Sequence, residues 1–144
     1  MKYDFIKESN ENIFYPVDAE EINYIEKELH LQVPKELREF FLEVGYGFIK
    51  GSGSNINRIM DTYSIKDFRL RQNDYNLYSD IEIYEEFEGD KLIFFEGSET
   101  SLISIGLSHC DINKIYYYDV EIASSLIEFL MKIQENDSYY LDYL

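Results

Sequence analysis

The sequence has two prolines and no tryptophan. It also has one cysteine and few basic residues, and these two shortages exclude classes of protein. The single cysteine, Cys110, cannot form an internal disulfide framework and is typical of a reducing compartment. No apolar run approaches the ~20 residues that cross a bilayer, and residues 1–12 are too polar and acidic for a signal peptide. We therefore expect a cytoplasmic protein that does not enter a membrane.

The shortage of basic residues carries the most information. Lysine and arginine number 13 against 29 acids, which gives a net charge of −16. Residues 73–144 alone hold 16 acids and only 3 bases. A field of this sign repels nucleic acid and anionic lipid and attracts basic partners. The charge therefore predicts no direct binding of nucleic acid, and it fits either a solubility device or a surface for a basic protein.

The chain is rich in apolar and aromatic residues. Its 144 residues are 45% hydrophobic and 17% aromatic, and 14 of them are tyrosine. That composition supplies a core without disulfides or metal, and the length predicts one domain over residues 1–144.

The first clear element is a helix over residues 18–30. Asp18 is placed to cap its N-terminus, and Glu21, three residues later, completes a capping box. Val17 before the cap and Ile22 at the fourth helical position form a hydrophobic staple. Apolar residues then recur on one face at the spacing of an amphipathic helix.

A second helix is predicted from Pro34 to Val44, with Pro34 at the first helical position, where a missing N–H costs nothing. Gly45 follows where a left-handed residue ends a helix, and a β-branched residue there is expected to cost about 1–2 kcal/mol. Tyr46 lies between Gly45 and Gly47, so it either contacts a partner at the surface or folds back into the core.

The middle of the chain is less regular. Residues 56–61 fit a short strand, and Ser64 is placed to cap a brief helix that carries Ile65 and Phe68. Residues 79–88 alternate like a strand but also match a helical turn. We favour the helix, because glutamate is a poor strand residue.

Three clearer strands follow, at residues 91–97, 101–107 and 113–120, and the turn-like breaks between them predict an antiparallel meander. An amphipathic helix over residues 122–134 closes the pattern. The order of elements predicts a single α+β domain, in which a mainly antiparallel sheet packs against N-terminal and C-terminal helices.

Few residues have a spacing that suits catalysis or metal binding. Cys110 adjoins His109, but a working Cys–His pair normally comes from distant positions in the chain. With Asp111 they offer three ligand types, yet no second cluster completes a tetrahedral site. The loop at residues 50–55 lacks the ending of a P-loop. We therefore predict no catalytic residue, no metal and no cofactor.

The acidic stretch that precedes Lys91 is the main candidate site. Between Arg71 and Lys91 there are seven acids and no base. The stretch is interpreted as a solvated face, as a protein-binding face, or as the carboxylates of a small hydrolase at residues 82–90. Tyrosine is enriched at protein interfaces. The candidate partner-binding residues are Asp80, Glu82, Tyr84, Glu85, Glu86, Glu88 and Asp90, together with Tyr46.

Tyrosines also occur in the predicted strand at residues 113–120. Because side chains alternate along a strand, Tyr116 and Tyr118 are expected on one face of the sheet and Tyr117 on the other.

Residues 25–51, IEKELHLQVPKELREFFLEVGYGFIKG, resemble the signature of the SUKH superfamily. That signature is a helix, a link that ends in Leu-Pro, a second amphipathic helix and an Asn-Gly-Gly end. Here Val33-Pro34 stands for the link, Phe40-Phe41-Leu42 for the helix, and Gly45-Tyr46-Gly47 replaces Asn-Gly-Gly. The later strands and the closing helix are also similar, so the resemblance covers about residues 18–134.

The resemblance implies a binding protein and not an enzyme. Bacterial members of the superfamily are mostly immunity proteins that neutralise toxins, often nucleases, and fungal relatives include regulators of cell-wall synthesis. The family has no catalytic residues to carry over. It implies an antitoxin whose partner is a cognate toxin, in the first instance a basic nuclease domain, with a non-toxin regulatory binding module as the alternative.

Overall fold

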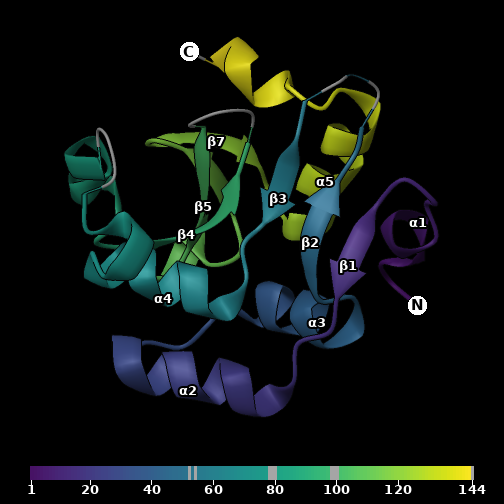
Figure 1. The fold of residues 1–144 in the computed structure, drawn as a ribbon. Coiled ribbons are helices and arrows are strands. Elements are labelled where there is room, and N and C mark those ends of the chain that lie inside the picture. The colour runs from purple at the N-terminus through teal and green to yellow at the C-terminus, as the bar shows by residue number, and fades with distance from the viewer. Residues whose placement is uncertain (52, 54, 78–80, 98–100, 144) are drawn as a thin grey trace.

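The computed structural model describes residues 1–51, 53, 55–77, 81–97 and 101–143 (Figure 1). Within these described residues, five α-helices and seven strands follow one another. The helices are α1 (Asp4–Lys7), α2 (Ala19–Leu29), α3 (Lys35–Glu43), α4 (Thr62–Leu70) and α5 (Leu126–Glu135). The strands are β1 (Ile13–Tyr15), β2 (Tyr46–Ile49), β3 (Asn57–Ile59), β4 (Lys91–Glu96), β5 (Leu102–Gly106), β6 (Ile115–Tyr117) and β7 (Val120–Ala123).

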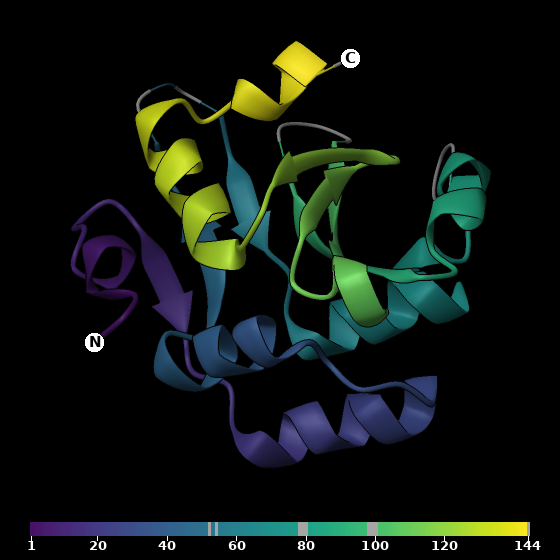
Figure 2. The same ribbon diagram turned by 180° about the vertical axis from the view of Figure 1, so that it is seen from behind.

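The seven strands form one antiparallel sheet in the order of the sequence, from β1 to β7. Helices α3 and α5 cover one face of this sheet, and α4 lies over β4 on the opposite face (Figures 1 and 2). Helix α2 packs against α4 at one end of the molecule. The predicted α+β class, with an antiparallel sheet between N-terminal and C-terminal helices, is confirmed.

Helix α2 forms as its capping signals predict. Asp18 is the N-cap, and its Oδ1 accepts a hydrogen bond from the Glu21 amide at 2.9 Å. Val17 and Ile22 are both buried, as a hydrophobic staple requires. The helix ends at His30, whose φ of 54° places it in the left-handed region.

Helix α3 begins one residue later than predicted, because Pro34 has extended backbone (ψ 143°) and is the N-cap. Its buried residues, at spacings of three and four, are Leu37, Phe40 and Phe41. Gly45 has φ +114°, so the expected positive φ is confirmed. A Cβ at Gly45 would also lie 1.9 Å from the carbonyl oxygen of Tyr15. The glycine is therefore required by the neighbouring strand as well as by the end of the helix.

Two predicted boundaries are corrected. Asp61, and not Ser64, caps α4, because its Oδ2 accepts the Ser64 amide at 3.2 Å. Ile122 lies in β7 and not in the closing helix, which begins at Leu126 after its N-cap, Ser125. The short elements α1, β1 and β2 were not predicted, since three or four residues carry too little periodicity to identify them.

The predicted meander is confirmed as β4, β5 and β6. The placement of Tyr118 was wrong. Its φ of 56° ends the strand, and its ring stacks on Tyr117 with centroids 4.7 Å apart, so it does not share a face with Tyr116. Residues Ile81–Phe87 form a 3-10 helix, which agrees with the helical interpretation, whereas residues 78–80 lie outside the described residues.

The hydrophobic core extends past residues 18–134 at both ends. Tyr3 and Ile6 are fully buried in it, and so is Tyr140. None of the helices in the described residues has the length and apolar composition to cross a membrane.

Candidate functional site

The predicted acidic site divides into exposed and buried members. Glu82, Glu85 and Glu86 are exposed, and with Ile83 they line a shallow depression on the 3-10 helix Ile81–Phe87. Asp90 is exposed, and its Oδ1 pairs with the Lys91 ammonium at 2.9 Å. Asp80 lies outside the described residues.

Tyr84, one of the candidate partner-binding residues, is buried, with 5% of its surface exposed, so its ring does not face solvent. Its ring stacks on Tyr118 at 5.4 Å between centroids and meets Phe68 edge-on at 6.3 Å. Burial, followed by the contact with Tyr118, raises the pKa of Tyr84, which keeps its hydroxyl neutral. The ring therefore anchors the acidic segment to the fold.

Glu88 is also buried, at 8% exposed, and forms a two-point ion pair with Arg71. The Nη2–Oε2 distance is 2.7 Å and the Nη1–Oε1 distance is 3.3 Å. Burial raises the pKa of the Glu88 carboxyl, and Arg71 opposes that shift. Because this carboxylate is buried and paired with Arg71, it is not part of the exposed acidic surface.

Tyr46 is half-buried on β2, and its ring lies 5.4 Å from that of Tyr15 on β1. The register pairs Tyr15 with Tyr46 and Ile13 with Phe48, so these four side chains share the sheet face that faces away from α3 and α5. Sequence reasoning missed Ile13, Tyr15 and Phe48. The alternation in IFY and YGFI was the available signal, but the strands were too short for it to be recognised.

A second pair of tyrosines lies beside an acidic group. Tyr24 on α2 and Tyr63 on α4 are both exposed, and their ring centroids are 5.9 Å apart. Asp18 and Glu20, also exposed, and the partly buried Glu21 begin α2 nearby. Burial, followed by the neighbouring carboxylates of Asp18 and Asp61, raises the pKa of Glu21.

The loop at residues 50–55 binds a carboxylate of the protein itself, that of Asp137. The Asp137 Oδ2 accepts hydrogen bonds from the amides of Gly53 at 3.1 Å and Asn55 at 3.2 Å, and its Oδ1 accepts the Asn55 side-chain amide at 3.0 Å. Asp137 is 2% exposed. A phosphate would have to displace this carboxylate, so the loop is a structural clamp.

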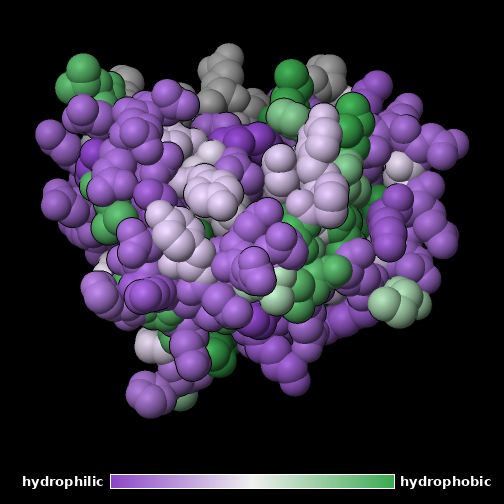
Figure 3. All heavy atoms as spheres, turned by 60° about the horizontal axis from the view of Figure 1, so that its bottom comes forward, coloured by the Kyte–Doolittle hydropathy of each residue, from purple (hydrophilic) through white to green (hydrophobic). Residues whose placement is uncertain are grey.

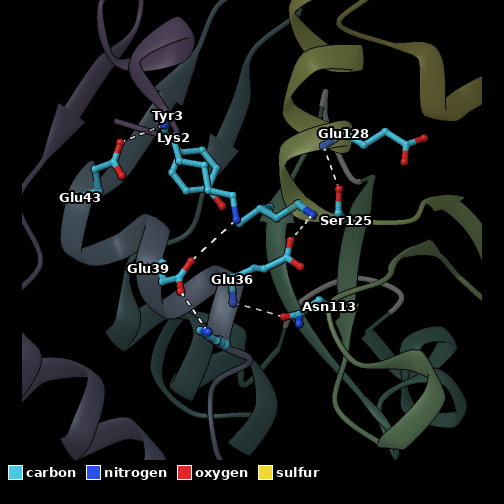
Figure 4. A network of polar contacts seen from close by, with 10 residues as sticks. Lys2, Tyr3, Glu36, Glu39, Glu43, Asn113, Ser125 and Glu128 are labelled. Carbon is cyan, nitrogen blue, oxygen red and sulfur yellow. Dashed lines mark hydrogen bonds and ion pairs between the residues drawn. The ribbon is translucent and has the colours of Figure 1, made fainter.

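The acids of α3 are also engaged inside the fold (Figure 4). The Tyr3 amide donates to Glu43 at 2.9 Å, and the Leu126 amide at the start of α5 donates to Glu36 at 2.9 Å. Glu39 lies 3.8 Å from each of two lysine ammonium groups. Helix α3 therefore ties the N-terminus to α5, and its acids do not form a free charged surface.

His109, Cys110 and Asp111 form a short 3-10 turn between β5 and β6. Cys110 is exposed and makes no disulfide. Among the described residues, no three His, Cys, Asp or Glu side chains are grouped so that they could hold a metal ion.

We expect Cys110→Ser and His109→Ala to leave partner binding and the melting temperature unchanged, because both side chains are exposed and neither forms a side-chain hydrogen bond or ion pair within the described part of the chain. Calorimetric binding and thermal unfolding of each variant test this. A folded variant that fails to bind would contradict it.

Comparison with known proteins shows two relationships. Residues 16–132 match the family described as SMI1 / KNR4 family (SUKH-1). The protein named "Immunity protein YxxD" of Bacillus subtilis (strain 168) is 64% identical over 144 residues, and the alignment covers 100% of this chain and 98% of that protein.

Proposed function

Because the chain belongs to the SMI1/KNR4 (SUKH-1) family, we propose that it is an immunity protein that binds and neutralises a cognate toxin in the cytoplasm. Members of this family act by binding and not by catalysis, and this chain is not an enzyme. The observation that carries the proposal is the 64% identity, over 100% of this chain, to a protein named as an immunity protein.

The toxin is proposed to be a nuclease. A nuclease domain presents a basic surface to its nucleic-acid substrate, and this chain carries a net charge of −16. An acidic inhibitor can therefore occupy the surface that would otherwise bind phosphate groups.

The exposed acids of the predicted site contribute to this interaction. Glu82, Glu85 and Glu86 face solvent on one short helix, with Asp90 close by in the sequence. The buried Tyr84 and Glu88 hold that helix against the rest of the protein. Tyr84 stacks on Tyr118, and Glu88 pairs with Arg71. Exposed charges of this kind mainly accelerate association and orient the partner.

Co-expression tests the proposal. The C-terminal domain of any large protein encoded beside this chain is expressed alone and together with it. We expect the domain alone to stop growth and the pair to grow normally. If the domain is toxic and this chain does not restore growth, the immunity function is wrong.

The nuclease assignment has its own test. Total RNA and DNA are extracted from cells that express the toxic domain without this chain, and we expect one of them to be degraded. Intact RNA and DNA in arrested cells would reject the nuclease assignment and leave the immunity function standing.

The exposed acids are tested by charge reversal. Glu82→Lys with Glu85→Lys should slow association with the toxin domain by ~5-fold or more and weaken the salt dependence of the rate. Stopped-flow mixing at several salt concentrations measures both quantities. The control is Glu135→Lys with Asp142→Lys, which changes the net charge equally at exposed positions elsewhere. Equal association rates for the two variants would place the binding surface away from Glu82 and Glu85.

A further inference from the structure

The outer face of β1 and β2 breaks the usual pattern of a solvated sheet. In an antiparallel sheet with one face in water, the outward positions are normally polar. Here all four outward side chains on these strands are apolar or aromatic, and three of them are strongly exposed: Ile13 at 53%, Tyr15 at 46% and Phe48 at 41%. The fourth is Tyr46. Contiguous exposed apolar patches on soluble proteins mark interaction sites.

The covering helices lie on the other side of the sheet. Phe14, which alternates with Ile13 and Tyr15, packs edge-on against Phe40 of α3 at 6.1 Å between ring centroids. Helix α4 covers β4 and not β1 or β2 (Figure 1). Ile56, 70% exposed before β3, extends the patch and shares a small depression with Phe48. We call Ile13, Tyr15, Tyr46, Phe48 and Ile56 the aromatic face.

The aromatic face lies on two closely paired strands. A Cβ at Gly45 or Gly47 would lie 1.9 Å or 2.0 Å from a carbonyl oxygen of the neighbouring segment, which shows how closely β1 and β2 approach. A surface that is already ordered loses little entropy when a partner binds, so its contacts contribute more fully to affinity.

Exposed tyrosines and acids also lie on α2 and α4. Figure 3 shows weakly polar and apolar side chains to the right of the centre and further pale ones toward the left, among hydrophilic neighbours. The exposed Tyr24–Tyr63 pair joins α2 to α4, the helix that lies on the same face of the sheet as the aromatic face. In the described part of the chain, the neighbouring Asp18, Glu20 and Glu21 form no ion pair with a lysine or arginine. Their charge is therefore available to a basic partner.

The charge also decides which partner covers the aromatic face. A second copy of a chain with a net charge of −16 would be repelled, whereas a basic protein would be attracted. We infer that the aromatic face is the central contact of the cognate toxin, which meets it with an apolar or aromatic centre surrounded by lysine and arginine. This inference rests on the proposed function.

The aromatic face and the exposed acids then have different kinetic roles. Glu82, Glu85 and Glu86 act on association, because exposed charges at a rim steer encounters. Tyr15 and Phe48 act on dissociation, because buried aromatic contacts at the centre of an interface hold most of the binding energy.

The test compares two double variants for binding to the toxin domain that arrests growth. Tyr15→Ala with Phe48→Ala should weaken binding about 100-fold, mainly through faster dissociation. The matched control is Leu42→Ala with Met131→Ala, which removes two exposed apolar side chains from α3 and α5 and should bind like the parent. Surface plasmon resonance measures both rates, and thermal unfolding shows that each variant is folded.

A third variant keeps the inference testable if Tyr15→Ala with Phe48→Ala does not fold. Ile56→Asp changes a side chain that is 70% exposed, so the fold should tolerate it, and it should weaken binding about 10-fold or more. Parent-like affinity of either folded variant of the aromatic face would overturn the inference.

Two other results have distinct meanings. If the parent chain itself does not bind the toxin domain, the proposed function fails. If light scattering finds the free parent as a dimer that Tyr15→Ala with Phe48→Ala separates, a second copy covers the aromatic face and the inference is overturned.

Discussion

Replacing Asp137 with alanine is expected to lower the free energy of unfolding by about 3–5 kcal/mol. The carboxylate is 2% exposed and accepts three hydrogen bonds from Gly53 and Asn55. Its backbone carbonyl accepts a fourth, from the buried side chain of Asn57 at 2.8 Å. Loss of the carboxylate leaves the donors of the β2–β3 loop without their acceptor, and each hydrogen bond to a charged group contributes more than a neutral one.

Urea unfolding of the purified chain measures this effect. The control is Asp142→Ala, an acid-to-alanine change in the same C-terminal segment at an exposed position, which should change stability by less than about 0.5 kcal/mol. Asp137→Asn keeps the size of the side chain and should fall between the two. If Asp137→Ala is as stable as Asp142→Ala, the clamp does not stabilise the loop.

Replacing Gly45 with valine is expected to cost about 4 kcal/mol or more. The positive φ of +114° alone disfavours a β-branched residue. In addition, the Cβ would lie 1.9 Å from the Tyr15 carbonyl oxygen and 2.8 Å from its carbon. Both atoms belong to the backbone, so β1 has to move away from β2. The cost therefore exceeds the strain of the left-handed region by itself.

The control for this variant is Gly89→Val, because an added Cβ at Gly89 meets no atom within 4 Å. We expect the melting temperature of Gly89→Val to stay close to that of the parent and that of Gly45→Val to fall well below it. Similar melting temperatures for the two variants would show that β1 adapts without loss of pairing. Since β1 and β2 carry the aromatic face, Gly45→Val should also weaken binding of the toxin domain.

Local signals predicted the helices well. The cap at Asp18 depends on an amide three residues away, and the apolar face of α3 depends on spacings of three and four residues. Such interactions lie within one helical turn, so the residue types in a short window determine them. The meander of β4 to β6 was predictable for the same reason, because turn residues separate three runs of strand-forming residues.

Predictions about exposure were less reliable. The acidic stretch before Lys91 was interpreted as a solvated face, a protein-binding face or the carboxylates of a hydrolase, but two of its candidate residues, Tyr84 and Glu88, are buried. Glu88 is covered because Arg71, 17 residues earlier, ends α4 in the left-handed conformation and directs its guanidinium to that carboxylate. The composition of the stretch does not predict this ion pair.

Composition, capping residues and helical spacing were sufficient to establish an acidic α+β protein with a glycine at the end of α3 and a resemblance to one family. The folded chain was needed to separate exposed acids from buried ones, to place Asp137 in the loop 82 residues away and to bring Tyr15 and Phe48 onto one open face. The physical reason is range. Caps and periodicity act between neighbours in the chain, whereas burial, ion pairing and surface continuity depend on which distant segments the sheet brings together.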